Sequence, residues 1–316
     1  MNSDLQGIHI IATGRYIPPK VVTNDDLSEI VDTNDEWIRQ RTGIERRHFS
    51  DGEKNVDMAV KAAKMAIDHA GIDTSELAAC VTATFSPDYF VPSVACMIQK
   101  ELELPDDIPS FDINAACSGF IYGMQVARGM LLQSPKKYAL VVGSEIISKF
   151  LDMEDRGTCV LFGDGAGAAI IELSDEKKYV SYLGAGGNDE YIFCPNADEE
   201  KRKVHMDGSK VFRFAVSTVP KCINNVLDKA GISKDDVDFY VCHQANKRII
   251  ENVAAKLDIP LEKFYMNLQE YGNTSAASVP IVLSEMNDKG LLRPGMKIVC
   301  VGFGAGLTWA GVLIEW

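Results

Sequence analysis

The chain has 316 residues, of which 46% are hydrophobic, 24% charged and 8% aromatic, a composition typical of a soluble globular protein that excludes a disordered chain. No apolar run approaches the roughly 18 to 20 residues of a membrane-spanning helix. The net charge of −13 disfavours sequence-independent binding to nucleic acid or to an anionic membrane, because both reward the neutralisation of phosphates.

The N-terminal segment, from Met1 to Tyr16, lacks the basic-then-apolar pattern of a secretory signal, so we expect a cytoplasmic protein. The eight cysteines form no C-x-x-C pair, in a chain long enough to need no disulfides. We therefore predict no metal site.

The predicted elements alternate between strands and helices. Residues 8–11 form a strand that ends at Gly14, and a later helix ends at Gly71 as its C-cap before a strand that reaches residue 85. A loop of small residues around Cys117 opens an apolar helix to residue 131, and a β-branched strand covers 138–143. This order predicts an α/β protein with mixed, largely buried sheets covered by helices.

Three landmarks recur later in the chain in the same order and at nearly the same spacing. They are a helix ending in AGI, a loop of small residues that opens an apolar helix, and a β-branched run ending in Gly. The paired positions are Ala70 and Ala230, Cys117 and Ser275, and Gly143 and Gly302. The chain is therefore predicted to hold two copies of one β-α-β unit.

We place the two halves at residues 1–173 and 174–316, in one compact body. Each half closes with a Gly-rich turn and a strand, and the shorter spacing there, from Gly165 to Gly304, indicates an insertion near 144–161. The helices after Cys117 and Thr274 are apolar nearly all round, as in a five-layer α-β-α-β-α sandwich with central helices. Segments 18–57 and 178–213 have no counterpart and are candidates for substrate binding.

Cys117 is the sharpest candidate for chemistry. It lies where a strand end turns into a helix, a place where the helix dipole and free backbone N–H groups lower the pKa of a thiol. Its small neighbours leave space for an acyl group. We therefore predict a nucleophile that is available as thiolate near neutral pH.

His243 and Asn273 come from the second half. If the halves are related by a pseudo-dyad, the loop before Thr274 faces the loop of Cys117, and the strand ending at His243 reaches the same place. Cys, His and Asn support two chemistries: papain-like hydrolysis, or acyl-thioester formation followed by carbon–carbon bond formation. For condensation, neutral His and the Asn N–H would stabilise the enolate left when malonyl carboxylate departs as CO2.

Two Gly-rich loops, 163–168 and 302–306, invite a nucleotide-binding interpretation that we reject. Both are predicted to follow a strand and run into another strand, so the helix N-terminus of a dinucleotide or phosphate site is missing. We expect tight β-turns there. The N–H of Ala305 is a candidate oxyanion donor beside the N–H of Cys117.

Basic residues gather late in this acidic chain. We expect part of the set to surround the entrance to the site and attract an anionic carrier or a cofactor phosphate. The set comprises Lys201, Arg202, Lys203, Lys210, Arg213, Lys247, Arg248 and Lys256.

From end to end the chain resembles the beta-ketoacyl-acyl carrier protein synthase III family, the initiating condensing enzymes of type II fatty acid synthesis, which have the thiolase fold. The segments that carry the resemblance are DTNDEWIRQRTGI (32–44), AACSGF (115–120), DRGTCVLFGDGAGA (155–168), HQANKRII (243–250) and YGNTSAASVP (271–280). Elongating relatives have two His beside the Cys and thiolases a second Cys, so Asn273 points to the initiating class.

The resemblance implies that Cys117 takes an acyl primer from acyl-CoA, such as acetyl-CoA or a short or branched one. His243 and Asn273 would then activate malonyl-acyl carrier protein for decarboxylative condensation. It also implies a homodimer and no metal or organic cofactor. The other implied residues are Thr33, Trp37, Arg41, Arg156, Gly208 and Asn246 for CoA; Arg213, Arg248 and Lys256 for the carrier protein; and Phe162 and Val91 for the acyl pocket.

The chain departs from the family pattern twice. Family members often read FGGG where this chain has Ala305, whose backbone must avoid a glycine-only conformation to serve as oxyanion donor. Some members have Phe at the position of Val91, in a segment that closes the partner's acyl pocket. We expect the smaller Val91 to admit a longer or branched primer.

Three other functions stay open at this point. One is a related acyl-CoA condensing enzyme of secondary metabolism on the same scaffold. The second is a Cys-dependent hydrolase or acyltransferase, which would cleave thioesters without malonyl carrier protein. The third is a silent homologue that only binds acyl thioesters, and the presence of Cys117, His243 and Asn273 argues against it.

Overall fold

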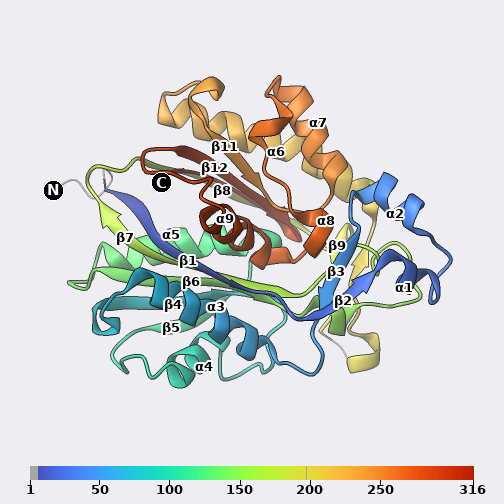
Figure 1. The fold of residues 1–316 in the computed structure, drawn as a ribbon, viewed down its shortest axis with the longest axis horizontal. Helices are drawn as coiled ribbons and strands as arrows, with labels where there is room; N and C mark the ends of the chain where they lie inside the picture. Colours follow the sequence, from blue (N-terminus) through green and yellow to red (C-terminus); the bar gives the residue numbers. More distant parts are fainter. Residues whose placement is uncertain (1–5, 197) are drawn as a thin grey trace.

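The computed structural model describes residues 6–196 and 198–316, which form two main sheets (Figure 1). The first has the strand order β1-β7-β6-β4-β5 and the second the order β8-β13-β12-β11. The strands are β1 Gly7–Tyr16, β4 Leu77–Ala83, β5 Ser110–Ile113, β6 Tyr138–Glu145, β7 Gly165–Ser174, β8 Tyr179–Asn188, β11 Phe239–Cys242, β12 Lys297–Gly304 and β13 Gly306–Glu315.

The two sheets repeat one pattern of strand directions. In the first, β6 is parallel to β4 and antiparallel to β7, which is antiparallel to β1. In the second, β12 is parallel to β11 and antiparallel to β13, which is antiparallel to β8. The first sheet uses only residues before 175 and the second only residues after 178. On this ground we propose residues 1–173 and 174–316 as the two halves.

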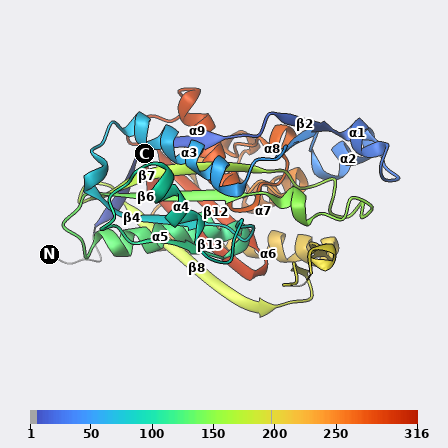
Figure 2. The same ribbon diagram turned by 90° about the horizontal axis from the view of Figure 1, so that it is seen from below.

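Helices α5 (Gly119–Leu131) and α9 (Ser278–Asp288) lie between the two sheets and contact strands of both. Helices α3 (Asn55–Ala70) and α4 (Val94–Glu101) cover the outer face of the first sheet, and α6 (Gly208–Ala230) and α7 (Lys247–Leu257) cover that of the second (Figures 1 and 2). The α-β-α-β-α sandwich with mixed sheets is therefore confirmed.

The sequences of the helices match their layers. No residue of α5 is exposed, and Ser278 to Met286 of α9 are all buried, as an apolar surface all round predicts. By contrast, α6 buries residues spaced three or four apart, such as Ala215, Val219 and Cys222, against the second sheet.

The predicted glycine caps are confirmed at Gly71 and Gly231, which end α3 and α6 in the left-handed conformation with φ of 60° and 62°. The loop 302–306 joins β12 to β13 in a tight hairpin, as predicted. The prediction of a strand before the loop 163–168 is wrong. Residues 155–161 form successive turns, because the Asp155 carbonyl accepts from Thr158 N and the Thr158 carbonyl from Leu161 N.

The prediction that all of 178–213 lacks a counterpart is wrong, because β8 occupies the place in the second sheet that β1 has in the first, and α6 begins at Gly208. The remaining parts of segments 18–57 and 178–213 gather at the end of the molecule opposite the C-terminus (Figure 1). They form the hairpin β2 (Lys20–Thr23) and β3 (Arg46–Phe49), helices α1 (Asn24–Ser28) and α2 (Asp35–Thr42), and the strand pair β9 (Ile192–Phe193) and β10 (His205–Met206). Helix α8 (Leu268–Tyr271) packs on β3. Within residues 6–196 and 198–316, none of the helices has the length and apolar character to cross a membrane.

Candidate active site

The turn that carries Cys117 is held in a left-handed conformation. The Asn114 side-chain Oδ1 accepts a hydrogen bond from Ala116 N at 3.2 Å, and Ala116 has a φ of +46°. The 3-10 turn Ala116–Ser118 then leads into α5. A positive φ is unusual for a residue with a Cβ atom, so the surrounding contacts hold this turn in place.

The same construction recurs in the second half. Asn273 Oδ1 accepts from Ser275 N at 2.9 Å, Ser275 has a φ of +49°, and the turn Ser275–Ala277 leads into α9. The two turns contact each other. Ala116 and Ser275 occupy the same place in the two turns, so the predicted pairing of Cys117 with Ser275 is off by one position.

The structure brings Cys117, His243 and Asn273 together around one cavity of about 190 Å³. The sulfur follows a strand of the first sheet, and the imidazole follows a strand of the second. Apolar side chains, among them Phe162 and Phe303, form much of the remaining wall.

His243 follows β11 and is buried. Its Nδ1 lies 2.7 Å from Oγ of Ser278, the first residue of α9, and its ring meets Phe303 edge-on at 5.2 Å between centroids. Burial lowers the pKa of the imidazole to about 3, so the ring is neutral at physiological pH. If the Ser278 hydroxyl donates to Nδ1, the remaining proton is on Nε2, where it can be donated to a ligand.

Asn273 is fixed through its backbone as well as its side chain. Its N–H donates to the Leu161 carbonyl at 2.8 Å, and its own carbonyl accepts from Gly163 N at 3.0 Å. Because Ser275 N already donates to Oδ1, Nδ2 is the part of the carboxamide that remains for a ligand. The arrangement makes Asn273 a hydrogen-bond donor.

Cys117 is half-buried and lines the cavity. Burial raises the pKa of its thiol to about 12, an interaction with the Ser275 hydroxyl lowers it, and the Glu145 charge raises it further. The predicted lowering by the helix N-terminus is therefore not the dominant effect. Desolvation outweighs it, because apolar side chains such as Phe162 and Phe303 form much of the cavity wall around the sulfur.

Glycines of β12 allow the turn that carries Cys117 to approach the second sheet. A Cβ atom on Gly304 would lie 2.8 Å from Cys117 N and 3.3 Å from its Sγ, and one on Gly302 would lie 2.9 Å from Ser118 Cα. The glycines in the loop 302–306 thus serve a close approach to Cys117 as well as the tight turn.

The backbone of Ala305 avoids the glycine-only conformation, as its predicted role as oxyanion donor requires. The non-glycine residues with positive φ in the described structure are Glu103, Ala116, Asp258 and Ser275, so Ala305 is outside the glycine-only region. The Thr308 hydroxyl lies 3.1 Å from the Ala305 carbonyl and 3.0 Å from the Ala115 carbonyl. It joins the Ala305 loop to the Cys117 turn.

Most of the residues that the resemblance implies for CoA line the cavity of Cys117: Trp37, Arg41, Arg156, Gly208 and Asn246. The Arg156 guanidinium carbon lies 4.7 Å from the centroid of the Trp37 ring, and that of Arg41 lies 5.8 Å from it. Asn246 caps α7 and donates to the Arg41 carbonyl at 3.0 Å. Thr33 is not part of this wall, but its buried hydroxyl has no hydrogen-bond partner among the described residues.

A second, wider cavity of about 1230 Å³ opens on another side of Cys117. Phe162 lines both cavities, and Val91 lines the second. Val91 is 83% exposed and its neighbour Phe90 79% exposed, although both are large and apolar. They form an uncovered apolar patch beside this cavity.

The predicted carrier-protein residues lie on two neighbouring outer helices. Arg213 belongs to α6, and Arg248 and Lys256 belong to α7, which packs against α6; all three are exposed. The Arg248 guanidinium lies over the ring of Phe212, which lines the cavity of Cys117. This places Arg248 beside the cavity wall.

Family models match two parts of the chain. The model described as 3-Oxoacyl-[acyl-carrier-protein (ACP)] synthase III matches residues 111–186, and that of the corresponding C-terminal region matches residues 227–316. Curated relatives named beta-ketoacyl-[acyl-carrier-protein] synthase III match over 99% of both chains: 46% identity in Clostridium acetobutylicum and 47% in Clostridium botulinum strain Kyoto. The chain belongs to this synthase III family.

Solved structures agree with the family. The 3-oxoacyl-[acyl-carrier-protein] synthase III of Aquifex aeolicus superposes with a TM-score of 0.93 at 42% identity, covering 98% of this chain and 100% of that one. The priming beta-ketosynthase of the R1128 polyketide pathway superposes at 0.92 with 32% identity, covering 98% and 96%. The chain is therefore an acyltransferase-type condensing enzyme with the thiolase-like fold.

Several polar residues of this synthase III site were missed by the sequence analysis. Ser278 holds His243, Thr308 joins two loops, and the buried Glu145 accepts a hydrogen bond from Ser275 Oγ at 3.2 Å. Ser278 and Ser275 lie within the YGNTSAASVP segment, which was a signal for them. Nothing local marks Glu145, because its partners are distant in the sequence.

Proposed function

We propose that this enzyme condenses an acyl-CoA primer with malonyl-acyl carrier protein to give 3-oxoacyl-acyl carrier protein, CO2 and CoA, and so initiates fatty acid synthesis. The observation that carries the proposal is the shared cavity: Cys117, His243 and Asn273 line it together with Trp37 and Arg156. The chemistry uses donors of the chain itself, and the acyl-CoA and the carrier protein are substrates.

The first half-reaction transfers the primer to Cys117. The sulfur attacks the thioester carbonyl, the bond from that carbonyl to the CoA sulfur breaks, and the proton lost by Cys117 ends on the CoA thiol. The high pKa of the resting thiol means that its proton leaves in the course of acyl transfer.

The second half-reaction forms the nucleophile by decarboxylation. The bond between the malonyl Cα and its carboxylate breaks, CO2 leaves, and the electron pair forms an enolate whose charge develops on the thioester oxygen. Asn273 Nδ2 and His243 Nε2 donate to that oxygen. A neutral imidazole can donate without a change of protonation state, which fits the low pKa of His243.

In the last step the enolate carbon attacks the acyl carbonyl on Cys117. The N–H groups of Cys117 and Ala305 stabilise the oxyanion, and collapse of the intermediate expels the Cys117 sulfur, which takes up a proton. The junction made by Thr308 supports the proposal, because it fixes the two donor-bearing loops relative to each other.

The CoA nucleotide is assigned to Trp37 and Arg156, with Thr33 and Arg41 nearby and Gly208 and Asn246 along the pantetheine arm. An adenine ring between Trp37 and Arg156 needs about 7 Å, the sum of two van der Waals contacts. Their present separation is 4.7 Å, so Arg156 moves off the indole when the nucleotide enters.

We assign Arg213, Arg248 and Lys256 to the docking of the acidic carrier protein. We also infer a homodimer, because exposed Phe90 and Val91 form an apolar patch beside the second cavity, and such patches mark interfaces. With Phe162, Val91 would shape the acyl pocket and admit longer or branched primers; activity on acetyl-CoA together with complete inactivity on isobutyryl-CoA would contradict this.

The test separates the two half-reactions. Mass spectrometry after incubation with acetyl-CoA should show acylation at Cys117 in the wild type and none in Cys117→Ser. His243→Ala and Asn273→Ala should still be acylated. Their rate of CO2 release from malonyl-acyl carrier protein should fall by a factor of roughly 10² or more, the scale for one lost oxyanion donor.

Condensation by either variant at the wild-type rate would refute the assignment. A hydrolase would instead release free acid from acetyl-CoA without any need for malonyl-acyl carrier protein. Formation of 3-oxoacyl product and CO2 only when both substrates are present is the result that supports condensation.

A further inference from the structure

Glu145, the last residue of β6, is completely buried. From the loop after β4 it accepts hydrogen bonds from Thr84 Oγ1 at 3.1 Å, Ser86 Oγ at 2.5 Å and Phe85 N at 3.2 Å. From the other half it accepts one from Ser275 Oγ at 3.2 Å. The carboxyl thus joins the two halves of the molecule.

This carboxyl has only neutral donors around it. In the part of the chain that the structure describes, no Lys, Arg or His forms an ion pair with Glu145. Burial raises its pKa to about 7. Such a group is unfavourable for stability, since an apolar residue of similar size would avoid the desolvation. Residues that break local rules in this way concentrate at functional sites.

Ser275 connects Glu145 to the catalytic carboxamide. Its backbone N–H donates to Asn273 Oδ1 while its hydroxyl donates to Glu145, and its φ of +49° is unfavourable for a residue with a side chain. The end of β6 also packs tightly on this turn, because a Cβ atom on Gly143 would lie 2.4 Å from the Ala276 carbonyl oxygen.

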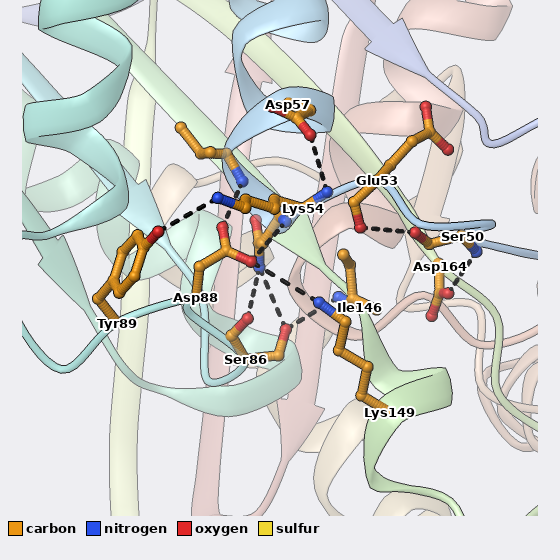
Figure 3. A network of polar contacts seen from close by, with 12 residues as sticks. Ser50, Glu53, Lys54, Asp57, Ser86, Asp88, Tyr89, Ile146, Lys149 and Asp164 are labelled. Atoms are coloured by element: carbon orange, nitrogen blue, oxygen red, sulfur yellow. Dashed lines mark hydrogen bonds and ion pairs between the residues drawn. The ribbon is translucent and has the colours of Figure 1, made fainter.

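The other side of Glu145 is anchored to a rigid polar network, whose outer part is drawn in Figure 3. The Ser86 carbonyl accepts a hydrogen bond from Asn55 Nδ2 at 2.8 Å, and the Ser86 Oγ accepts one from Ile146 N at 2.9 Å. The Asp88 carboxylate then caps the first backbone N–H groups of α3, at 3.0 Å from Asn55 N and 2.9 Å from Val56 N. The loop that holds Glu145 is therefore fixed to α3.

We propose that Glu145 is a positioning residue for the condensation: its buried carboxyl holds Ser275, and through Ser275 it orients the Asn273 carboxamide relative to Cys117. The inference rests on the proposed function. Because Asn273 acts in decarboxylation, loss of the Glu145–Ser275 contact impairs CO2 release more than acylation of Cys117.

The test uses the full-length enzyme and two separate readouts. Decarboxylation of malonyl-acyl carrier protein is measured in a Cys117→Ala background, where condensation does not interfere, and acylation by acetyl-CoA is measured in the background with Cys117. Ser275→Ala removes the hydroxyl that donates to Glu145 and that also lowers the pKa of the Cys117 thiol. We expect it to slow decarboxylation, measured without Cys117, at least tenfold, and to slow acylation by a clearly smaller factor.

Two substitutions at Glu145 extend the test. Glu145→Gln keeps one oxygen to accept from Ser275 Oγ and should retain more decarboxylation than Glu145→Leu, which cannot accept. The control is Glu285→Gln. Glu285 is also a buried carboxyl, held by Tyr265, by Asn267 and by an ion pair with Lys289, and it lines neither cavity. It should leave both half-reactions unchanged.

Parent-rate decarboxylation in Ser275→Ala or in folded Glu145→Leu would overturn the proposal. An equal fall in both half-reactions together with a lower melting temperature would also overturn it, since that is the result of a merely structural role. If wild-type enzyme makes no 3-oxoacyl product at all, the proposed function itself fails. If the wild-type enzyme makes 3-oxoacyl product and the variants decarboxylate at the parent rate, only the role of Glu145 is refuted.

Discussion

At Cys117 two effects act on the thiol in opposite directions. The turn into α5 offers backbone N–H groups that favour the thiolate, whereas removal of the sulfur from water favours the thiol. The pKa of about 12 shows that desolvation dominates in the resting enzyme.

The first prediction concerns the reactivity of Cys117. A thiol with a pKa of about 12 is protonated at neutral pH, and its thiolate fraction rises about tenfold for each unit of pH below that value. The rate of alkylation by iodoacetamide should therefore rise about tenfold per pH unit from pH 7 to 9. Mass spectrometry of the Cys117 peptide measures it, and a plateau below pH 8 would contradict the assignment.

The second prediction concerns the charge of His243. Its pKa is lowered from 6.5 to about 3, so the imidazole takes up a proton only when the pH falls far below the usual range. Decarboxylation by the Cys117→Ala, Glu145→Gln variant, in which residue 145 does not titrate, should stay level between pH 6 and 8, with no inflection near 6.5. Long-range nitrogen NMR of labelled histidine should show a neutral ring, and a half-maximal loss of rate near pH 6.5 would be inconsistent with it.

At the scale of elements, glycines in β12 decide how closely the two halves approach. The Cys117 turn lies against Gly302 and Gly304, where any side chain would clash with backbone atoms of that turn. The alternation of these glycines along the strand directs both toward the same face. The strand is thus as much a part of the site as the turn that carries Cys117.

The third prediction is that Gly304→Ala disturbs this approach. Its Cβ would lie 2.8 Å from Cys117 N, so the turn must shift, at a cost of about 1 to 3 kcal/mol in the free energy of unfolding. Acylation of Cys117 should fall strongly as well. Gly187→Ala in β8 is the control, since nothing lies within 4 Å of its Cβ position. The measurements are thermal unfolding and the rate of acylation. Equal values for the two variants would show that a side chain at position 304 is tolerated, which contradicts the prediction.

At the scale of the whole molecule, the charge distribution is uneven. The chain carries a net charge of −13, yet Arg213, Arg248 and Lys256 lie exposed on the adjoining helices α6 and α7 near the cavity. A local basic surface on an acidic protein orients an acidic partner, because the rest of the surface repels it.

The fourth prediction follows from that surface. Arg248→Glu should weaken binding of malonyl-acyl carrier protein by about tenfold at low ionic strength, and added salt should reduce the difference, since the contact is electrostatic. Lys64→Glu on α3, in the opposite outer layer (Figure 1), is the charge-matched control. Equal carrier-protein affinities of the two variants, measured by calorimetry, would place the docking surface elsewhere.

Much of this organisation could be predicted from local patterns. Gly71 and Gly231 mark helix ends, the apolar stretch after Thr274 marks a helix buried between layers, and the repeated landmarks indicate the duplication. Each of these features depends on neighbours close by in the chain. The role of Gly302 and Gly304 beyond the turn was not predictable, because the atoms they approach belong to Cys117 and Ser118, in the other half of the sequence.

The amino-acid order alone specified the alternating layers, since periodicity, capping and small-residue loops act over short distances, and it also predicts the two-copy plan and the residues that we propose for the chemistry. The ionisation state of those residues was decided only by the folded chain. Desolvation, which sets the ionisation of Cys117 and His243, is the sum over every group that excludes water, and those groups come from all parts of the molecule. The proposed role of Glu145 likewise depends on the folded chain, because its partner Ser275 is distant in the sequence.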